Sequence, residues 1–247
     1  MFMRRANRLV NTGCLSALVV LTVVLGIVAS WLWYRHWHDE KVNSERKEKS
    51  LASILEQAEA TAHETARALD TGGAADADAL TGVIWQHSRA PVITYSPSRR
   101  EFTAMVAKSA QYDRDVVLPG GGAVQVTRCF VFIYTQHPGG TWASKVSERS
   151  DDVCRPSTRI GNRVRLALTR FANLNDEDLT GAGVQNALDP TGRRFIDVKN
   201  VARAGDMVTA SVLVSSTERA VGQCYRLTRP VADGDQRAVA AVPALSC

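Results

Sequence analysis

The feature that most constrains this chain is an uncharged segment close to its N-terminus. Residues 9–34 contain no Asp, Glu, Lys, Arg or His. A bilayer core of roughly 30 Å takes about 20 helical residues to cross, and the apolar residues 14–33 provide that length. The sequence therefore predicts a membrane-spanning helix, which limits the environments that the rest of the chain can occupy.

The residues that flank this segment distinguish an anchor from a removable signal. Basic side chains precede it and aromatic side chains crowd its far end: Arg4, Arg5 and Arg8, then Trp31, Trp33, Tyr34 and Trp37. A basic start is common to signals and anchors, and residues 27–30 resemble a signal-peptidase site. Large amphipathic rings prefer the headgroup level of a bilayer, so we expect an uncleaved anchor with the lipid bilayer as its first partner.

The charges beyond the segment leave its orientation open. Five bases follow it, and the positive-inside rule alone would keep the rest of the chain in the cytoplasm: Arg35, Lys41, Arg46, Lys47 and Lys49. Neighbouring acids at helical spacing can pair with these bases, and long domains translocate largely regardless of charge. The orientation therefore depends on other evidence, which the cysteines supply.

The cysteines favour an oxidising compartment for the body of the chain. Cys14 lies in the predicted membrane helix, which leaves an even set after it: Cys129, Cys154, Cys224 and Cys247. These four form no CxxC pair and have no His at zinc spacing, so structural disulfides are expected. We therefore expect a single-pass protein of the cell membrane, with a cytoplasmic N-terminus and an extracytoplasmic body.

The body of the chain is almost neutral. The whole chain has 30 Lys and Arg against 25 Asp and Glu, but four of the bases, Arg4, Arg5, Arg8 and Arg35, belong to the anchor region. The other 26 bases nearly balance the acids. This balance provides no electrostatic footprint for nucleic acid, so none is expected as a partner.

A helix is expected over residues 39–69, ending before Gly72 and Gly73. Its apolar residues recur at spacings of three and four: Leu51, Ile54, Leu55, Ala58, Ala62, Ala66 and Leu69. Such a stripe can pack on the chain's own sheet, or it can pair with a second copy as a coiled-coil stalk. The many Ala residues favour the first arrangement, and a homodimer through this juxtamembrane helix is the alternative.

Two series of short elements follow. The first is expected to have a helix at residues 79–87 and strands at 92–95, 102–109, 116–118, 124–135 and 142–146. A turn at Pro119 and the three glycines after it is expected to join the strands at 116–118 and 124–135 as a hairpin. The second series is expected to have helices at 159–173 and 175–187 and strands at 195–198, 207–215, 222–228 and 238–242.

These two series match at several points, which predicts an internal duplication. Leu80-Thr81-Gly82 corresponds to Leu179-Thr180-Gly181, and residues 102–109 match 208–215 at four of eight positions. Cys129 and Cys154 are 25 residues apart, and Cys224 and Cys247 are 23 apart. A disulfide tying the last two strands of each copy would select these pairings from the three possible, although Ala- and Val-rich strands also match by chance.

Residue types that carry catalysis or bind metals occur only in isolation or in incomplete patterns. They are His36, His38, His63, His87, His137, Ser44 with Lys47, Ser144 with Lys145, Asp113 with Asp115, Asp151 with Asp152, and residues 173–178. The histidines lack a third metal ligand, and the acidic segment lacks the Gly and closing Glu of a calcium loop, so it is expected to cap a helix. The serines and acids lack the partners that would activate them. We therefore expect no enzyme activity, cofactor or metal.

The whole pattern is typical of an α+β protein. We expect an anchor at residues 1–35, a juxtamembrane helix at 36–72, and two tandem helix-plus-meander units at 73–157 and 158–247. In outline this layout resembles small cystatin-like or NTF2-like folds, but it shares no motif from which residue roles could be carried over. It favours a non-catalytic binding or accessory protein of an envelope complex, with another membrane protein as partner.

Two other functions stay open at this stage. A ligand-sensing domain would have an apolar cavity between helix and sheet. An envelope hydrolase would have converging polar groups with shifted pKa values in a concave site.

Overall fold

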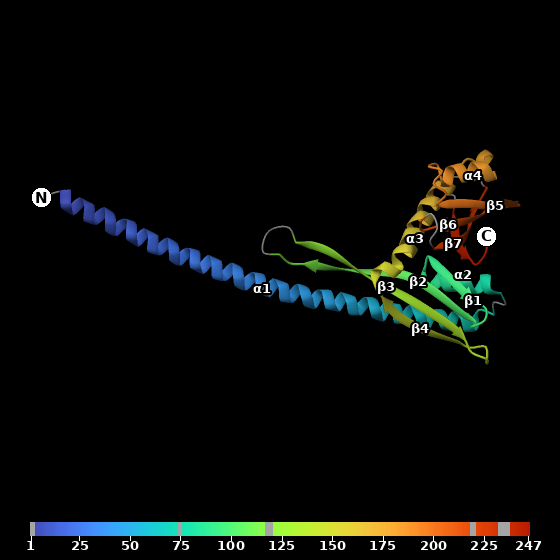
Figure 1. The fold of residues 1–247 in the computed structure, drawn as a ribbon, viewed down its shortest axis with the longest axis horizontal. Helices are drawn as coiled ribbons and strands as arrows, with labels where there is room; N and C mark the ends of the chain where they lie inside the picture. The colour runs from blue at the N-terminus through green and yellow to red at the C-terminus, as the bar shows by residue number, and fades with distance from the viewer. Residues whose placement is uncertain (1–2, 74–75, 117–120, 218–220, 232–237) are drawn as a thin grey trace. The chain divides into compact units, whose positions relative to one another are not determined.

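The computed structural model describes residues 3–73, 76–116, 121–217, 221–231 and 238–247, with side chains from residue 16 onward. Within these ranges the fold is α+β: a long apolar N-terminal helix is followed by two four-stranded antiparallel sheets with helices (Figure 1). The chain divides into two units, Met1–Ala52 with Ala110–Val126 and Ser53–Ser109 with Thr127–Cys247.

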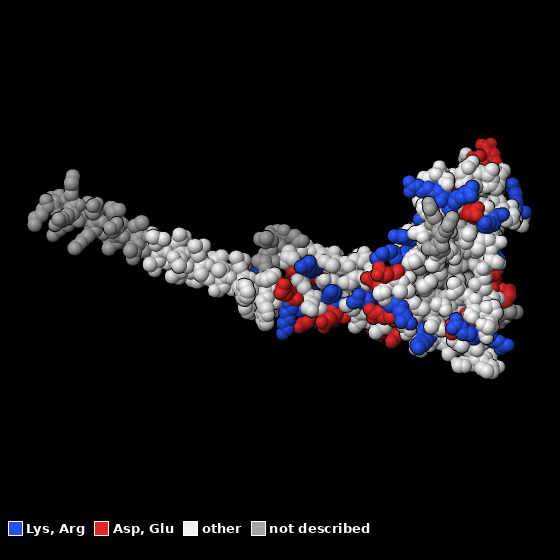
Figure 2. Space-filling view, viewed as in Figure 1, with Lys and Arg blue, Asp and Glu red and all other residues white. Residues whose placement is uncertain are grey.

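Helix α1 (Met3–Thr71) contains the uncharged segment. The side chains of residues 16–34 are exposed, and Figure 2 shows them as a white surface that no charge interrupts. This helix is long and apolar enough to cross a membrane. The predicted flanking aromatics Trp31, Trp33, Tyr34 and Trp37 are exposed, whereas the side chains of Arg4, Arg5 and Arg8 lie outside the described residues.

A separate helix from residue 39 was predicted, whereas α1 is continuous from Met3 to Thr71. No proline lies in this range, and Glu and Lys are good helix formers, so nothing interrupts the backbone hydrogen bonds across the charged residues. The helix ends where predicted. Gly73 adopts a left-handed φ of 56°, and the Gly72 N–H donates to the Ala68 carbonyl at 2.9 Å.

In the first unit, the charged part of α1 contacts the end of strand β2 (Glu101–Arg114). Asn43 exchanges two hydrogen bonds with the Asp115 backbone, at 2.7 and 2.9 Å. Arg46 pairs with the Asp115 carboxylate at 2.8 Å and donates to the Asp113 carbonyl at 2.9 Å. The bases that follow the uncharged segment therefore do not pair only along the helix, as the sequence suggested.

The hairpin between β2 and β3 (Gly122–Gln136) differs from the prediction. Strand β2 runs to Arg114 instead of ending at Ser109, because backbone pairing continues through polar residues that carry no apolar pattern. Val116, expected to begin a short strand, lies outside both strands. The predicted turn at Pro119 falls in residues 117–120, outside the described residues.

In the second unit, the first sheet has its strands in chain order, β1-β2-β3-β4, with β1 at Val92–Ser96 and β4 at Trp142–Arg149. The C-terminal part of α1 lies on this sheet. Lys108 Nζ donates to the Thr61 hydroxyl at 2.9 Å, and Asp70 accepts a hydrogen bond from the Trp142 N–H at 2.7 Å. Large side chains of the sheet are fully buried: Phe102, Phe130, Phe132 and Tyr134.

The apolar stripe of α1 is buried, as expected for a helix on its own sheet. Five of its members are at most 7% exposed: Ile54, Ala58, Ala62, Ala66 and Leu69. Leu55, placed in the same stripe by the sequence, is 40% exposed, because only a narrow row of the helix faces the sheet. A homodimer through this helix would have to use the exposed face instead.

The second sheet follows helix α3 (Asp151–Ala172), the 3-10 turn η1 (Asp176–Asp178) and helix α4 (Gly181–Leu188). Its strands are also in chain order: β5 (Ile196–Ala204), β6 (Met207–Ser215), β7 (Gly222–Pro230) and β8 (Ala240–Ala244). Helix α3 shares a core with this sheet, in which Ile160, Val164 and Phe171 meet Val212 and Tyr225.

Helix α3 begins at Asp151, well before the predicted start at Arg159. Asp151 and Asp152 lie in its first turn, where carboxylates are stabilised by the helix dipole. Pro156 removes one backbone hydrogen bond but does not end the helix. The proline and the polar residues around it hid this start from the sequence pattern.

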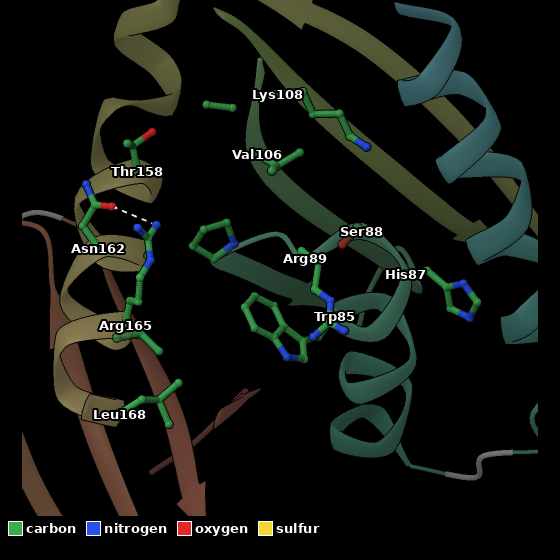
Figure 3. Close-up of a pocket in the computed structure, with 14 residues that line it drawn as sticks. Trp85, His87, Ser88, Arg89, Val106, Lys108, Thr158, Asn162, Arg165 and Leu168 are labelled. Atoms are coloured by element: carbon green, nitrogen blue, oxygen red, sulfur yellow. Dashed lines mark hydrogen bonds between the residues drawn. The ribbon is translucent and has the colours of Figure 1, made fainter. Parts of the chain in front are cut away.

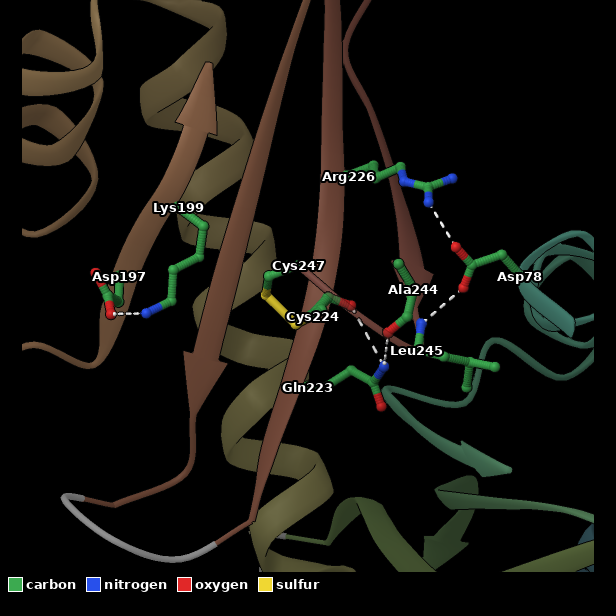
Figure 4. The surroundings of a disulfide bond; sticks show 9 residues. All are labelled: Asp78, Asp197, Lys199, Gln223, Cys224, Arg226, Ala244, Leu245 and Cys247. Carbon is green, nitrogen blue, oxygen red and sulfur yellow. Dashed lines mark hydrogen bonds and ion pairs between the residues drawn. A yellow bond between two sulfur atoms is a disulfide. The ribbon is translucent and has the colours of Figure 1, made fainter. Parts of the chain in front are cut away.

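Both disulfides have the pairings that the loop lengths predicted, Cys129 with Cys154 and Cys224 with Cys247. The first does not tie two strands, however. Cys129 lies on β3 and Cys154 in α3, because the early start of α3 includes that cysteine. This pair is buried, whereas Cys247 follows β8 and is exposed (Figure 4).

The two Leu-Thr-Gly sequences do not occupy equivalent positions. Thr81 is buried inside α2 (Ala77–Ser88) and donates to the Ala77 carbonyl at 2.8 Å. Thr180 instead caps the start of α4 and accepts from the Gly183 N–H at 3.1 Å. Residues 102–109 and 208–215 each lie in the second strand of their sheet.

Two buried polar side chains of β7 join the sheets within the second unit. Gln223 accepts from the Ile93 N–H of β1 at 2.9 Å and donates to the Ala244 carbonyl of β8 at 2.7 Å. The Tyr225 hydroxyl donates to the Pro91 carbonyl. These contacts hold the start of β1 against the second sheet, and they thereby position α2 relative to α3.

Candidate functional site

A cleft of about 520 Å³ opens between the C-terminal end of α2, strand β2 and helix α3 (Figure 3). Trp85, Pro91, Val106 and Leu168 contribute apolar surface to it. Pockets that hold small molecules have volumes of roughly 300–1,000 Å³ and are mostly apolar, with a few well-placed polar groups. The cleft therefore has the size and lining of a small-ligand site.

Arg89 ends α2, and its side chain lies beside Trp85. It is the C-cap residue, with a left-handed φ of 54°, and its N–H donates to the Trp85 carbonyl at 3.0 Å. Its guanidinium carbon is 5.8 Å from the centre of the Trp85 ring, within range of a cation–π contact. Ser88 holds this turn, since its hydroxyl donates to the Ile84 carbonyl at 2.7 Å and accepts from the Ala90 N–H at 3.2 Å.

Helix α3 provides the opposite wall. Arg165 Nη2 donates to the Asn162 Oδ1 at 3.2 Å, which orients the guanidinium group. Leu168 lies one turn further along the same helix. Figure 3 shows Arg165 and Leu168 on one side of the cleft and Trp85 and Arg89 on the other.

The cleft has basic groups and no lining carboxylate among the residues that the structure describes. Four lining side chains carry or can carry positive charge: His87, Arg89, Lys108 and Arg165. Figure 3 shows His87 and Lys108 directed away from the space between α2 and α3. Lys108 donates to Thr61 instead, and burial lowers the pKa of its ammonium group. Arg89 and Arg165 are therefore the groups that can meet a charge in the cleft.

Gly161 lets α3 approach the start of β1 at the base of the cleft. A Cβ at this position would lie 2.9 Å from Pro91 Cγ, and a proline ring has little freedom to move aside. We expect Gly161→Ala to lower the free energy of unfolding by about 1 kcal/mol. The added methyl group should cost about 1–3 kcal/mol through overpacking, and this cost exceeds the stability gained from the better helix propensity of Ala.

The control for this prediction is Gly181→Ala in α4, where a Cβ would meet nothing within 4 Å. Urea unfolding of the full chain in detergent micelles measures both variants. The Gly181 variant should match or exceed the wild type, and a Gly161 variant of equal stability would show that the helix and the proline can separate freely.

Of the residues singled out from the sequence, only His87 lies at this cleft. His36 contacts Glu40 on α1 at 3.4 Å, while His63 and His137 are exposed. Among the described residues, no three or more His, Cys, Asp or Glu side chains come together in a way that could hold a metal ion. Asp113 and Asp115 belong to the first unit, and Asp151 and Asp152 begin α3.

The acidic segment at residues 173–178 has a structural partner that the sequence did not suggest. Arg229 on β7 is fully buried, and its Nη1 donates to the carbonyls of Phe171 at 2.9 Å and Leu174 at 2.7 Å. Its Nη2 pairs with Asp176. The arginine thus caps the C-terminal end of α3, where backbone carbonyls lack helical partners.

Three further groups outside the cleft have shifted pKa values. Burial raises the pKa of Tyr134 to about 12, against a smaller opposing effect of the Thr65 hydroxyl. Burial also raises the pKa of Tyr225. Burial, and then the charge of Arg159, lower the pKa of Arg163. In all three groups the largest cause of the pKa shift is desolvation, which follows from packing in the folded chain.

Trp85, Arg89 and Arg165 could not be grouped from the sequence, because the two arginines lie 76 residues apart on different helices. One local signal was present. Arg89 takes the position after α2 at which Gly or Asn is usual, and Ala90-Pro91 follows it.

Comparison with known proteins assigns the chain to no family. No protein-family model and no curated protein sequence matches it. Among solved structures, a protein described as "Ntf2 like protein involved in plasmid conjugation" is similar over 64% of this chain and 76% of its own, with 11% sequence identity and a TM-score of 0.17. A TM-score this low supports no statement about the role of this chain, so the function has to be argued from its own residues.

Proposed function

We propose that this chain is a single-pass membrane protein whose extracytoplasmic body is a non-catalytic binding or accessory component of an envelope complex. The observation that carries the proposal is α1, whose exposed, uncharged segment continues into a body tied by two disulfides. A segment of this kind is stable in lipid, and structural disulfides persist in oxidising compartments. The N-terminus is then cytoplasmic, and the aromatic cluster lies at the outer headgroup level.

The finer organisation proposed for the body is a duplication. Each copy would consist of a long helix, a short helix and a four-stranded meander, with the boundary between β4 and α3. The identical consecutive strand order of the two sheets supports this, as do the matching residues 102–109 and 208–215. Under this proposal the two copies have diverged, because the two disulfides are placed differently.

Cysteine accessibility in the native membrane tests the location. Membranes prepared under thiol-blocking conditions are washed with alkaline carbonate and then labelled with a maleimide reagent, with and without prior reduction. We expect the chain to stay in the membrane pellet and Cys129, Cys154, Cys224 and Cys247 to react only after reduction. If the body lay in a reducing compartment, the blocking reagent would already occupy these four thiols. Failure of all four to react even after reduction would therefore remove the proposal.

Photo-crosslinking tests the proposed binding role. A photoreactive amino acid replaces Leu166 or Met207, exposed apolar residues of the second unit at 49% and 43%. We expect a reproducible crosslink to one membrane protein from at least one position in native membranes. A survey of exposed positions over both sheets that yields no reproducible product would count against an accessory role.

A ligand-sensing domain is the second candidate, and the cleft between α2 and α3 is the observation that favours it. The cleft combines apolar walls with two guanidinium groups. Saturable binding of a small molecule to the full chain tests this role independently of any partner.

A further inference from the structure

We infer that the cleft between α2 and α3 binds a small organic carboxylate, with its charged group between Arg89 and Arg165 and its apolar body against Trp85 and Leu168. The inference deepens the second candidate role and is independent of the proposed accessory role. Measurements of ligand binding and of partner crosslinking can therefore fail separately.

The charge of the ligand follows from the two arginines. They come from different helices, and no carboxylate lines the cleft among the described residues. The arginine ion pairs within the described residues engage Arg46, Arg99, Arg128, Arg155, Arg226 and Arg229. Neither cleft arginine takes part in them. Two guanidinium groups without a carboxylate beside them form a site for an anion, and their planar donors suit a carboxylate.

The apolar body of the ligand follows from the walls. Trp85 and Leu168 are half-buried and face each other across the cleft (Figure 3). Pro91 and Val106 add further apolar surface. An inorganic anion would leave these groups uncovered, whereas a flat hydrocarbon or aromatic body covers them and gains the free energy of their burial.

The backbone at Arg89 accounts for the position of its side chain. Arg89 has a left-handed φ, which Gly or Asn usually provides after a helix, and Arg100 and Arg194 also have a positive φ but do not line the cleft. At φ 54°, α2 ends and the Arg89 side chain lies alongside Trp85. One residue thus ends the helix and supplies a charged wall of the cleft.

The test compares two probes that differ only in charge, 2-naphthoate and its neutral isostere 2-naphthamide. Binding to the full chain in nanodiscs of zwitterionic lipid is measured by equilibrium dialysis, with empty nanodiscs as background. The variants are Arg89→Gln, Arg165→Gln and the double change. Arg159→Gln is the matched control, an exposed arginine of α3 that does not line the cleft.

We expect wild-type protein to bind 2-naphthoate at least about tenfold more tightly than 2-naphthamide, with affinity that falls as KCl is added. Each cleft variant should lower the affinity for 2-naphthoate about tenfold and leave the affinity for 2-naphthamide unchanged. The loss of one charge-assisted pair of about 1.4 kcal/mol corresponds to a factor of ten in affinity. Arg159→Gln should bind like the wild type.

Three results would overturn the inference. They are the absence of saturable binding of either probe above empty nanodiscs, equal binding of the two probes by the wild type, and unchanged 2-naphthoate binding by the double variant. If a variant unfolds, the preference of the wild type for 2-naphthoate over 2-naphthamide still decides, because a site that presents no positive charge to the ligand would bind the two probes equally.

Discussion

Replacing Arg229 with methionine is expected to lower the free energy of unfolding by about 3 kcal/mol, because removal of a buried charged donor leaves its partners unsatisfied. The side chain is fully buried, and its guanidinium group serves two functions at the end of α3. It donates hydrogen bonds to the Phe171 and Leu174 carbonyls at the negative end of the helix, and it pairs with Asp176. Methionine fills much of the same volume but provides no donor.

A matched control lies three residues earlier on the same strand. Arg226 points to the other face of β7, its side chain is 51% exposed, and it pairs with Asp78 at 2.5 Å (Figure 4). Arg226→Met should cost less than about 1 kcal/mol, as exposed ion pairs do. Urea unfolding of both variants of the full chain in micelles, followed by circular dichroism, makes the comparison. Equal losses of unfolding free energy in the two variants would mean that the burial of Arg229 adds nothing to its effect on stability.

Replacing Cys129 and Cys154 together with alanine is expected to lower the free energy of unfolding by about 3–5 kcal/mol. Closing a loop of 25 residues contributes about 3 kcal/mol by the chain-entropy estimate, and the two buried sulfurs leave small voids. This disulfide joins β3 of the first sheet to α3 on the second. Its loss should therefore loosen the connection between the two sheets as well as the global fold.

The pair Cys224 and Cys247 is the comparison, because its loop of 23 residues is of nearly the same length. Cys247 is exposed and terminal, so its removal should mainly free β8. Hydrogen exchange should then rise at residues 240–244 before it rises in the core. The Cys14→Ala variant should match the wild type. Early exchange in the first sheet after loss of Cys224–Cys247 would contradict this assignment.

Several elements could be predicted because the signals for them are local. Strand β6 has the predicted bounds, Met207–Ser215, since it is a short run rich in Val and other apolar residues with buried and less buried positions in alternation. The end of α1 at Gly72 and Gly73 was equally predictable from the conformations open to glycine. The start of α3 was not, because Pro156 and polar residues obscured a helix that its acidic first turn stabilises.

The apolar N-terminal segment, the chain order of most helices and strands, and the pairing of the cysteines could be predicted from the sequence, since each depends on composition, periodicity or loop length along a continuous stretch. The strand expected to begin at Val116 and the break expected before residue 39 were wrong. The partners of Arg229, and the placement of Arg89 and Arg165 on opposite sides of one cleft, could be established only from the folded chain. Burial and proximity of side chains far apart in sequence depend on how α2 and α3 pack against the strands, and no periodicity in the chain encodes that packing.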